Sequence, residues 1–157
     1  MTINDPEVVA ELRALYPGYE QALISNDVDT LMAMFWTGAD VMRFGVTENL
    51  YGPEELAAFR KGRPAANLAR TVTRLDVVSF GRDFGSITLE FERAGTSGAV
   101  RGRQSQVWVR FAEGWRIVSA HVSLLPQPST HPLPEGASRI AKGKRSAALG
   151  KLQKRTQ

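Results

Sequence analysis

The sequence predicts an α+β domain in which amino-terminal helices pack against one face of a strongly curved antiparallel sheet. Two observations indicate this class. Apolar residues recur at helical spacing in the first part of the chain, up to about residue 62. Residues 71–125 instead form runs rich in β-branched and aromatic residues, with the period-two alternation of strands. Helices followed by a meander of strands are typical of an α+β domain.

The first helix is expected over residues 6–26, where the apolar positions at helical spacing include Leu12 and Tyr19. The pair Pro17-Gly18 interrupts this segment. A proline inside a helix removes one backbone hydrogen bond and crowds the preceding turn. The pair therefore predicts a kink or two abutting helices at this point.

Two further helices are expected. Asp27 or Asp29 caps a short helix that extends to Phe35. Residues 52–55, Gly-Pro-Glu-Glu, begin a third helix that ends near residues 62–64. Proline suits the first turn of that helix, and the two acids face the positive end of its dipole.

The strands fall into two groups. Two short strands, residues 39–46 and 48–51, separate the second helix from the third. Long strands follow the third helix and are joined by turns that contain glycine. The long strands are expected at residues 71–80, 84–93, 100–111 and 115–125.

Four prolines between residues 126 and 134 end this pattern. We therefore expect a domain over residues 1–126 and a basic, proline-led tail over residues 127–157. From Pro132 the tail holds seven Lys or Arg and one Glu, a net charge of +6, which leaves −2 for the rest of a chain that totals +4. A flexible, solvated tail is expected, and docking on an acidic partner is the alternative. The mildly acidic domain argues against nucleic-acid binding.

Composition excludes several kinds of site. The chain has no cysteine, so disulfides and thiolate chemistry are absent. Its two histidines, His121 and His131, belong to no cluster with metal-ligand spacing, and no glycine-rich loop predicts a nucleotide site, so neither metal nor cofactor is expected. No segment is long and apolar enough to span a bilayer, and residues 1–5 lack the features of a secretory signal. A cytoplasmic location is the default expectation.

Polar residues on the last two strands indicate a pocket. Strict alternation places Gln106 and Trp108 on one face of the strand at residues 100–111, and it places His121 and Ser123 on one face of the next strand. In a strongly bent sheet, Gln106, His121 and Ser123 are expected to point into one cavity. A solvated polar face is the alternative.

Arg43 and Tyr19 are the other candidates. Arg43 lies among apolar residues and must be paired, because an isolated buried charge is very costly. It either grips a ligand carboxylate or forms a salt bridge to Glu20 or Glu48. Tyr19 lies on the helix face that should meet the sheet, where a core role is the alternative. Weaker candidates are two arginines and three aromatic residues: Arg63, Arg70, Trp36, Tyr51 and Trp108.

Several different short motifs are spread along most of the domain. They are Glu-Asn-Leu-Tyr-Gly at 48–52, Ala-Phe-Arg at 58–60, Arg-Pro at 63–64, Ala-Arg-Thr-Val-Thr at 69–73, Phe-Gly-Arg-Asp-Phe at 80–84, Gly-Arg-Gln-Ser-Gln at 102–106, Trp-Val-Arg at 108–110, Gly-Trp-Arg-Ile-Val at 114–118 and Ala-His-Val-Ser-Leu at 120–124. Together these motifs resemble the AtzH-like family of the SnoaL-like, nuclear-transport-factor-2-like superfamily. The resemblance covers about residues 6–125.

The resemblance implies a cone-shaped fold with a pocket, a homodimer formed through the sheet, and a link to an amidase partner in cyanuric acid catabolism. It also implies a cofactor-independent, decarboxylating amidohydrolase that converts a dicarboxylated urea into allophanate. Tyr19 and Arg43 match the catalytic tyrosine and arginine of the family. His121, Gln106, Ser123 and Arg70 would then surround the substrate.

Two alternatives remain. An isomerase or cyclase of the superfamily would need an acid such as Asp40, Glu90 or Glu92 in the pocket. A protein that binds a small acid, or that serves as an amidase partner, would need no turnover at all.

Overall fold

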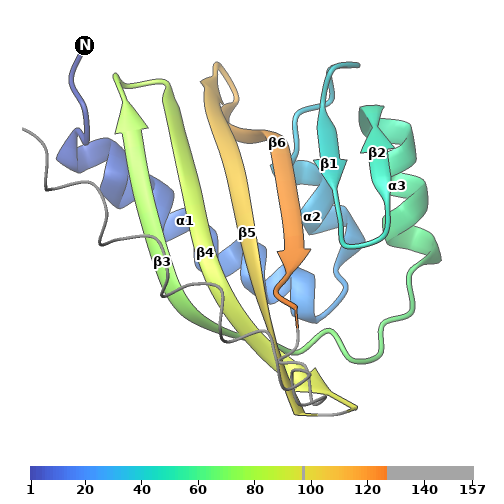
Figure 1. Ribbon diagram of the computed structural model, residues 1–157. Coiled ribbons are helices and arrows are strands. Elements are labelled where there is room, and N and C mark those ends of the chain that lie inside the picture. Colours follow the sequence, from blue (N-terminus) through green and yellow to red (C-terminus); the bar gives the residue numbers. More distant parts are fainter. Residues whose placement is uncertain (97, 127–157) are drawn as a thin grey trace, which may run out of the picture. The chain divides into compact units, whose positions relative to one another are not determined.

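The computed structural model describes residues 1–96 and 98–126, in which helices precede a six-stranded sheet (Figure 1). The elements in chain order are α1 (Pro6–Ile24), α2 (Val28–Met34), β1 (Met42–Phe44), β2 (Asn49–Tyr51), α3 (Gly52–Gly62), β3 (Thr71–Phe80), β4 (Phe84–Gly95), β5 (Gly98–Phe111) and β6 (Gly114–Leu124). The predicted α+β class is therefore confirmed, and residues 1–126 form one compact unit with a cone-shaped arrangement. The predicted tail at residues 127–157 lies outside the described residues.

Helix α1 continues through Pro17, so of the two predicted forms, a kink or two abutting helices, the second is wrong. It begins at Asp5, whose carboxylate accepts a hydrogen bond from the Glu7 N–H at 3.0 Å. Pro17 lies on the exposed side, whereas Tyr16 and Tyr19 on the other side are buried against the sheet. Packing on both sides of Pro17 outweighs the one backbone hydrogen bond that proline removes.

The sheet has the strand order β2-β1-β6-β5-β4-β3. It is mixed rather than antiparallel throughout, because β1 runs parallel to β6 while the other neighbours are antiparallel. The two short strands are shorter than predicted, with three residues each. The bounds of β3 match the prediction, and those of β4, β5 and β6 differ from it by one or two residues.

The two faces of the sheet differ in what covers them. Helix α1 lies against one face, which we call the inner face, and the other is the outer face (Figure 1). On β5, Gln104, Gln106 and Trp108 are buried on the inner face, as the alternation predicts. The core between the helices and the sheet includes Val8, Leu12, Leu31, Phe35, Ile87, Leu89, Trp108 and Ile117.

Strand β6 carries a bulge at Val118. In its pairing with β5, Ile117 lies opposite Trp108 and Ser119 lies opposite Val107, so Val118 is an extra residue. One extra residue exchanges the two faces of a strand. Ile117 before the bulge is buried, and Ala120 after it is buried as well, whereas regular alternation would place them on opposite faces.

None of the described helices is long and apolar enough to cross a membrane.

Candidate functional site

A cavity of about 300 Å³ lies between the second half of α1 and the inner face of the sheet. This is the lower end of the size range of small-molecule sites. It includes four of the candidate residues from the sequence, namely Tyr19, Arg43, Arg63 and Arg70. The lining is completed by Leu23, Val46, Thr47, Glu48, Phe59, Leu68, Phe91, Arg93, Gln104, Val122 and Leu124.

Arg43 is held at the cavity wall by an ion pair. Its Nη1 donates to Glu48 Oε1 at 2.6 Å, and its guanidinium lies 5.2 Å from the Phe59 ring centre. Glu48 rather than Glu20 is therefore the structural partner of Arg43. Burial raises the pKa of Glu48, but the bond to Arg43, the charge of Arg43 and the hydrogen bonds from Thr47 together outweigh it, and the net pKa is lowered. The Arg43 Nε meets no partner among residues 1–96 and 98–126, so it is free for a ligand or water.

Arg70 is paired on two sides. Its Nε and Nη2 donate to the two oxygens of Glu20 at 2.7 and 2.8 Å, and the Tyr16 hydroxyl donates to the same carboxylate at 2.6 Å. The guanidinium also stacks 4.4 Å from the Phe91 ring centre. Burial lowers the pKa of Arg70, but Glu20 outweighs this and the net pKa is raised. Arg70 is therefore a fixed cation in the cavity wall.

Tyr19 lies among arginines. It is 2% exposed, and its ring centre is 5.9 Å from that of Tyr16. Burial raises the pKa of the Tyr19 hydroxyl, but Arg60, Arg43 and Arg70 together outweigh it and the net pKa is lowered. A phenol with a lowered pKa gives up its proton more readily at neutral pH.

Arg60 is a buried cation that the sequence analysis did not single out. It comes from α3, has no exposed surface, and lies 5.8 Å from the Phe35 ring centre. Its three guanidinium nitrogens have no hydrogen-bond partner of good geometry among the described residues. Burial lowers its pKa.

Gln104 replaces Gln106 as the glutamine of the cavity. Gln106 Oε1 accepts a hydrogen bond from the Trp108 indole N–H at 3.1 Å, and Gln106 does not line the cavity. Gln104 does line it, and both ends of its amide lack partners within the described part of the chain. Gln104 can therefore donate to and accept from a ligand in the cavity.

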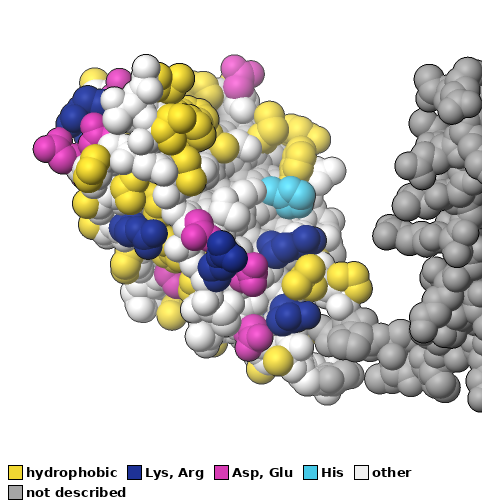
Figure 2. All heavy atoms as spheres, turned by 60° about the vertical axis from the view of Figure 1, so that its left-hand side comes forward, with side chains coloured by type: hydrophobic (Ala, Val, Ile, Leu, Met, Phe, Trp, Pro, Cys, Tyr) yellow, Lys and Arg dark blue, Asp and Glu magenta, His cyan; other side chains and the backbone are white. Residues whose placement is uncertain are grey.

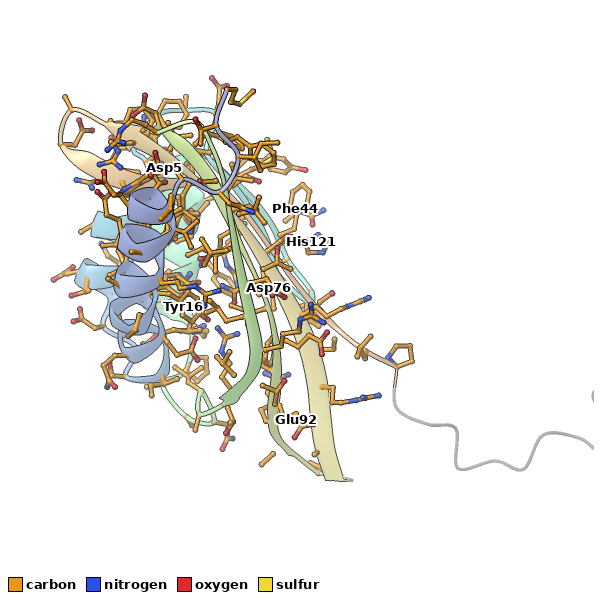
Figure 3. All side chains as sticks on the ribbon, turned by 90° about the vertical axis from the view of Figure 1, so that its left-hand side faces the viewer. Asp5, Tyr16, Phe44, Asp76, Glu92 and His121 are labelled. Carbon is orange, nitrogen blue, oxygen red and sulfur yellow. The ribbon has the colours of Figure 1, made fainter. Side chains whose placement is uncertain are left out.

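His121 and Ser123 do not reach the cavity, so the prediction that they point into it is wrong. The bulge at Val118 turns both to the outer face, where His121 is exposed. Figure 3 shows His121 beside Phe44 on the side of the sheet away from α1, with Tyr16 between helix and sheet. The rings of His121 and Phe44 are 6.2 Å apart.

The remaining aromatic candidates also lie elsewhere. Trp108 is 1% exposed in the core, and Tyr51 is 55% exposed beside Phe44. Trp36 stacks on Phe111 with ring centres 5.8 Å apart and lines a second cavity of about 310 Å³ next to α2.

The acids named for an isomerase or cyclase are not in the cavity. Asp40, Glu90 and Glu92 are exposed, and none of them is among the lining residues. Glu48 is the acid of the lining, and it is bound to Arg43. Within the described ranges, no three His, Asp or Glu side chains gather as metal ligands.

Arg63 completes the cationic group. Its Nη2 donates to Asn26 Oδ1 at 3.0 Å, and its Nε has no partner in the described part of the chain. Burial, followed by repulsion from Arg60 and Arg43, lowers the pKa of Arg63 to about 10. Arg63 is a candidate from the sequence, whereas Arg60, Arg93 and Gln104 are recognised as functional residues only in the structure. The inner-face alternation of β5 was the signal for Gln104, because it placed that residue beside Gln106 and Trp108.

Comparisons with known proteins agree on the fold. The model of the AtzH-like family matches residues 1–128. A protein of unknown function from the DUF3225 family of Pectobacterium atrosepticum is 44% identical, with a TM-score of 0.75, over 79% of this chain and 95% of that one. A cystatin-like fold protein from Burkholderia xenovorans is 37% identical, with a TM-score of 0.74, over 82% of this chain and 99% of that one. An NTF2-like protein from Pseudomonas putida shares the fold at 17% identity, with a TM-score of 0.68, over 80% of this chain and 92% of that one. No curated protein matches the chain.

Proposed function

Because the chain belongs to the AtzH-like family, we propose that it removes an N-carboxyl group from a small dicarboxylated urea or amide. The reaction type is the conversion of a dicarboxyurea to allophanate, alongside an amidase in the catabolism of nitrogenous compounds. The observation that carries this proposal is the excess of buried guanidinium groups around a small cavity that also presents a free amide.

The charge around the cavity favours an anionic ligand. Five arginines line it or lie directly behind it, against two glutamates. Both glutamates are already bound, Glu48 to Arg43 and Glu20 to Arg70. The positive charge left over suits a small molecule with more than one carboxylate. The arginines are Arg43, Arg60, Arg63, Arg70 and Arg93.

Free donors in the wall suit a carboxylated urea. The Nε atoms of Arg43 and Arg63 can each donate to a carboxylate oxygen in a charge-assisted hydrogen bond. The Gln104 amide can pair with the N–H and C=O groups of a urea, which is an amide on both sides of its carbon. These contacts would orient the substrate with one N-carboxylate near Tyr19.

Loss of an N-carboxylate needs a proton at nitrogen. In this proposal the Tyr19 hydroxyl donates that proton as the C–N bond breaks. The electron pair of the C–N bond goes to the nitrogen, and the carboxylate leaves as carbon dioxide. The fixed cations Arg43 and Arg70 would stabilise the anionic substrate and the charge that develops.

Substitution of Tyr19 and Arg43 tests the proposal. With an N-carboxyurea as substrate and carbon dioxide release as readout, Tyr19→Phe should lower kcat by about 10²–10⁴-fold, the usual contribution of a general acid. Arg43→Lys should raise KM and lower kcat/KM, because lysine cannot keep both the Glu48 bond and a free Nε donor. Circular dichroism and thermal unfolding would verify that both variants fold.

Two variants serve as controls. Tyr51→Phe and His121→Gln change an exposed tyrosine and the outer-face histidine, so both should keep full turnover. Full turnover in Tyr19→Phe and Arg43→Lys would overturn the proposal. Tight binding of a dicarboxylate without any turnover would instead favour a small-acid-binding role.

We also propose that the outer face binds a second copy of the chain. Exposed apolar side chains there include Met42, Tyr51 and Phe84, at 38%, 55% and 42% exposure. Figure 2 shows hydrophobic groups and an imidazole at the surface of this face. Light scattering should give the mass of a dimer for the chain and that of a monomer for Met42→Glu. A monomeric unsubstituted chain would contradict this proposal.

A further inference from the structure

The guanidinium of Arg60 is the least compensated charge among the described residues. It has no exposed surface, and Nε, Nη1 and Nη2 all lack hydrogen-bond partners of good geometry within residues 1–96 and 98–126. Burying an unpaired charge is strongly unfavourable, and buried polar groups are normally satisfied. A buried charge without a partner is therefore expected to have a functional role, such as binding or stabilising an anion.

The neighbours of Arg60 are mostly cations or are already paired. Arg43 from β1 and Arg63 from the end of α3 are both positive and repel it. Glu48, which follows β1, is bound to Arg43 and to Thr47. Glu48 is therefore not free to turn to Arg60.

Tyr19 from α1 is the neighbour that can change its charge. It is as deeply buried as Arg60, and its hydroxyl lies within reach of the Arg60 guanidinium, although no hydrogen bond of good geometry joins the two groups. The other charged or titratable groups that face Tyr19 are Tyr16 on the same helix, Arg43 and Arg70 from the sheet side, and Arg63 after α3. Glu20, the acid nearest to Tyr16, is bound by Arg70 and by the Tyr16 hydroxyl. Loss of the Tyr19 proton would therefore create an anion against an unpaired cation.

We propose that Arg60 is a positioning residue that takes up the negative charge of the Tyr19 phenolate formed when Tyr19 protonates the substrate. The identity of the proton acceptor rests on the proposed function, whereas the Arg60–Tyr19 pair does not. In the step, the Tyr19 O–H bond breaks and an N–H bond forms on the substrate. The C–N bond to the carboxylate breaks and carbon dioxide leaves. The phenolate then takes a proton from solvent water.

The electrostatics of the pair support this role. Burial alone would raise the pKa of Tyr19, and Arg60 heads the groups that reverse the direction. A cation fixed before the reaction stabilises the developing phenolate without reorganisation. The pKa of the neighbouring Tyr16 is raised, by burial first and then by Glu20, although its ring is only 5.9 Å from that of Tyr19. The pKa values of the two tyrosines of α1 are therefore shifted in opposite directions.

Titration of Tyr19 in the full chain tests the pair directly. Phenolate formation is followed by ultraviolet difference absorbance, and subtraction of the Tyr19→Phe titration isolates Tyr19 from the other two tyrosines. In Arg60→Met the Tyr19 midpoint should rise by about 1–3 pH units, the usual effect of losing an adjacent opposite charge. Arg60→Lys should keep most of the lowered midpoint. Arg74→Met, which removes an exposed arginine on β3, is the matched control and should leave the midpoint unchanged.

Turnover gives a second readout. A general acid must be protonated, so activity falls as pH rises through the Tyr19 pKa, and in Arg60→Met this loss should move to higher pH. At neutral pH kcat should fall about 10–100-fold with little change in KM, and Arg60→Lys should recover most of it. An unchanged Tyr19 titration in Arg60→Met would overturn the inference even if N-carboxyureas are turned over. A shifted titration without such turnover would uphold the pair and reject the proposed substrate.

Discussion

The space between α1 and the sheet has two ends that are built differently. The closed end contains Val8, Leu12, Ile87, Trp108 and Ile117, all at most 1% exposed. The pocket end contains Tyr19, Arg43, Arg60, Arg70 and Gln104, which are slightly more exposed on average and mostly polar or charged.

The two ends also differ in whether their buried polar atoms have hydrogen-bond partners. At the closed end the indole N–H groups of Trp108 and Trp115 find acceptors in Gln106 and Glu11, at 3.1 and 2.9 Å. At the pocket end Arg60 and Gln104 keep donors without partners among the described residues. One helix and one sheet thus supply both a core that stabilises the fold and a site that is less stable than it could be. Destabilised sites of this kind are where binding and catalysis occur.

The largest expected effect is at the closed end. Leu12→Ala should lower the free energy of unfolding by about 2–5 kcal/mol, because it leaves a cavity in a tightly packed core. Urea unfolding measures it. Leu23→Ala, at 8% exposure in the cavity wall, should cost less because the site is open to solvent. Equal losses would show that the two ends are packed alike.

Two inner-face glycines sharpen the comparison. A Cβ at Gly85 would lie 2.5 Å from Leu12 Cδ1, so Gly85→Ala should cost about 1–3 kcal/mol of stability by overpacking, with KM unchanged. A Cβ at Gly102 would lie 2.2 Å from the Phe91 ring, which lines the cavity and supports Arg70. Gly102→Ala should therefore raise KM. A raised KM in Gly85→Ala together with an unchanged KM in Gly102→Ala would contradict the distinction between the two ends.

A smaller effect of opposite sign is expected for Arg60. Arg60→Met should raise the free energy of unfolding by about 1 kcal/mol, the low end of the gain found when buried charged groups are replaced by apolar side chains. Thermal unfolding at neutral pH measures this, and Arg74→Met should leave stability nearly unchanged. A loss of stability in Arg60→Met would mean that the guanidinium is compensated in solution.

The smallest expected effect is on the unfolding free energy at acidic pH. The pKa of Glu48 is lowered in the folded state, so its stabilising contribution is complete above its ordinary pKa of 4.5 and is lost as pH falls through the lower folded value. Glu48→Gln should therefore flatten the fall of unfolding free energy below about pH 4.5. Glu92→Gln on the exposed side of β4 provides the comparison. Identical acid curves for Glu48→Gln and the unsubstituted chain would exclude this role.

The helices and the long strands could be predicted because hydrophobic periodicity is a local property. The inner face of β5 followed from the same alternation, which held over Gln104, Gln106 and Trp108. Glu48 was one of two partners considered for Arg43, and the turn between β1 and β2 brings it there. The catalytic roles of Tyr19 and Arg43 stay predictions.

Other features depend on tertiary contacts. In the sequence Arg60 is one of two basic residues in the last turn of α3, where basic residues normally face solvent. Its burial comes from the packing of Phe35 and Tyr19 around it. Helix α1 continues through Pro17 instead of dividing into two helices, because Tyr16 and Tyr19 pack on its buried side, and the sequence does not show how much that packing contributes. The faces of β6 were misassigned after Val118, because pairing with β5 sets the bulge.

The bulge at Val118 also bears on how such a pocket can evolve. Deleting Val118 would leave the faces unchanged, because Ile117, Ser119 and Ala120 would then simply alternate. If instead all residues were kept and the bulge were lost, β6 beyond Ile117 would slip by one residue on β5, and His121 and Ser123 would face the cavity in place of Ala120, Val122 and Leu124. An imidazole would then replace an apolar wall without any substitution in the cavity. A one-residue slip of β6 on β5 can thus change the chemistry of this site more than most point mutations, and the bulge is a place where relatives with different reactions can diverge.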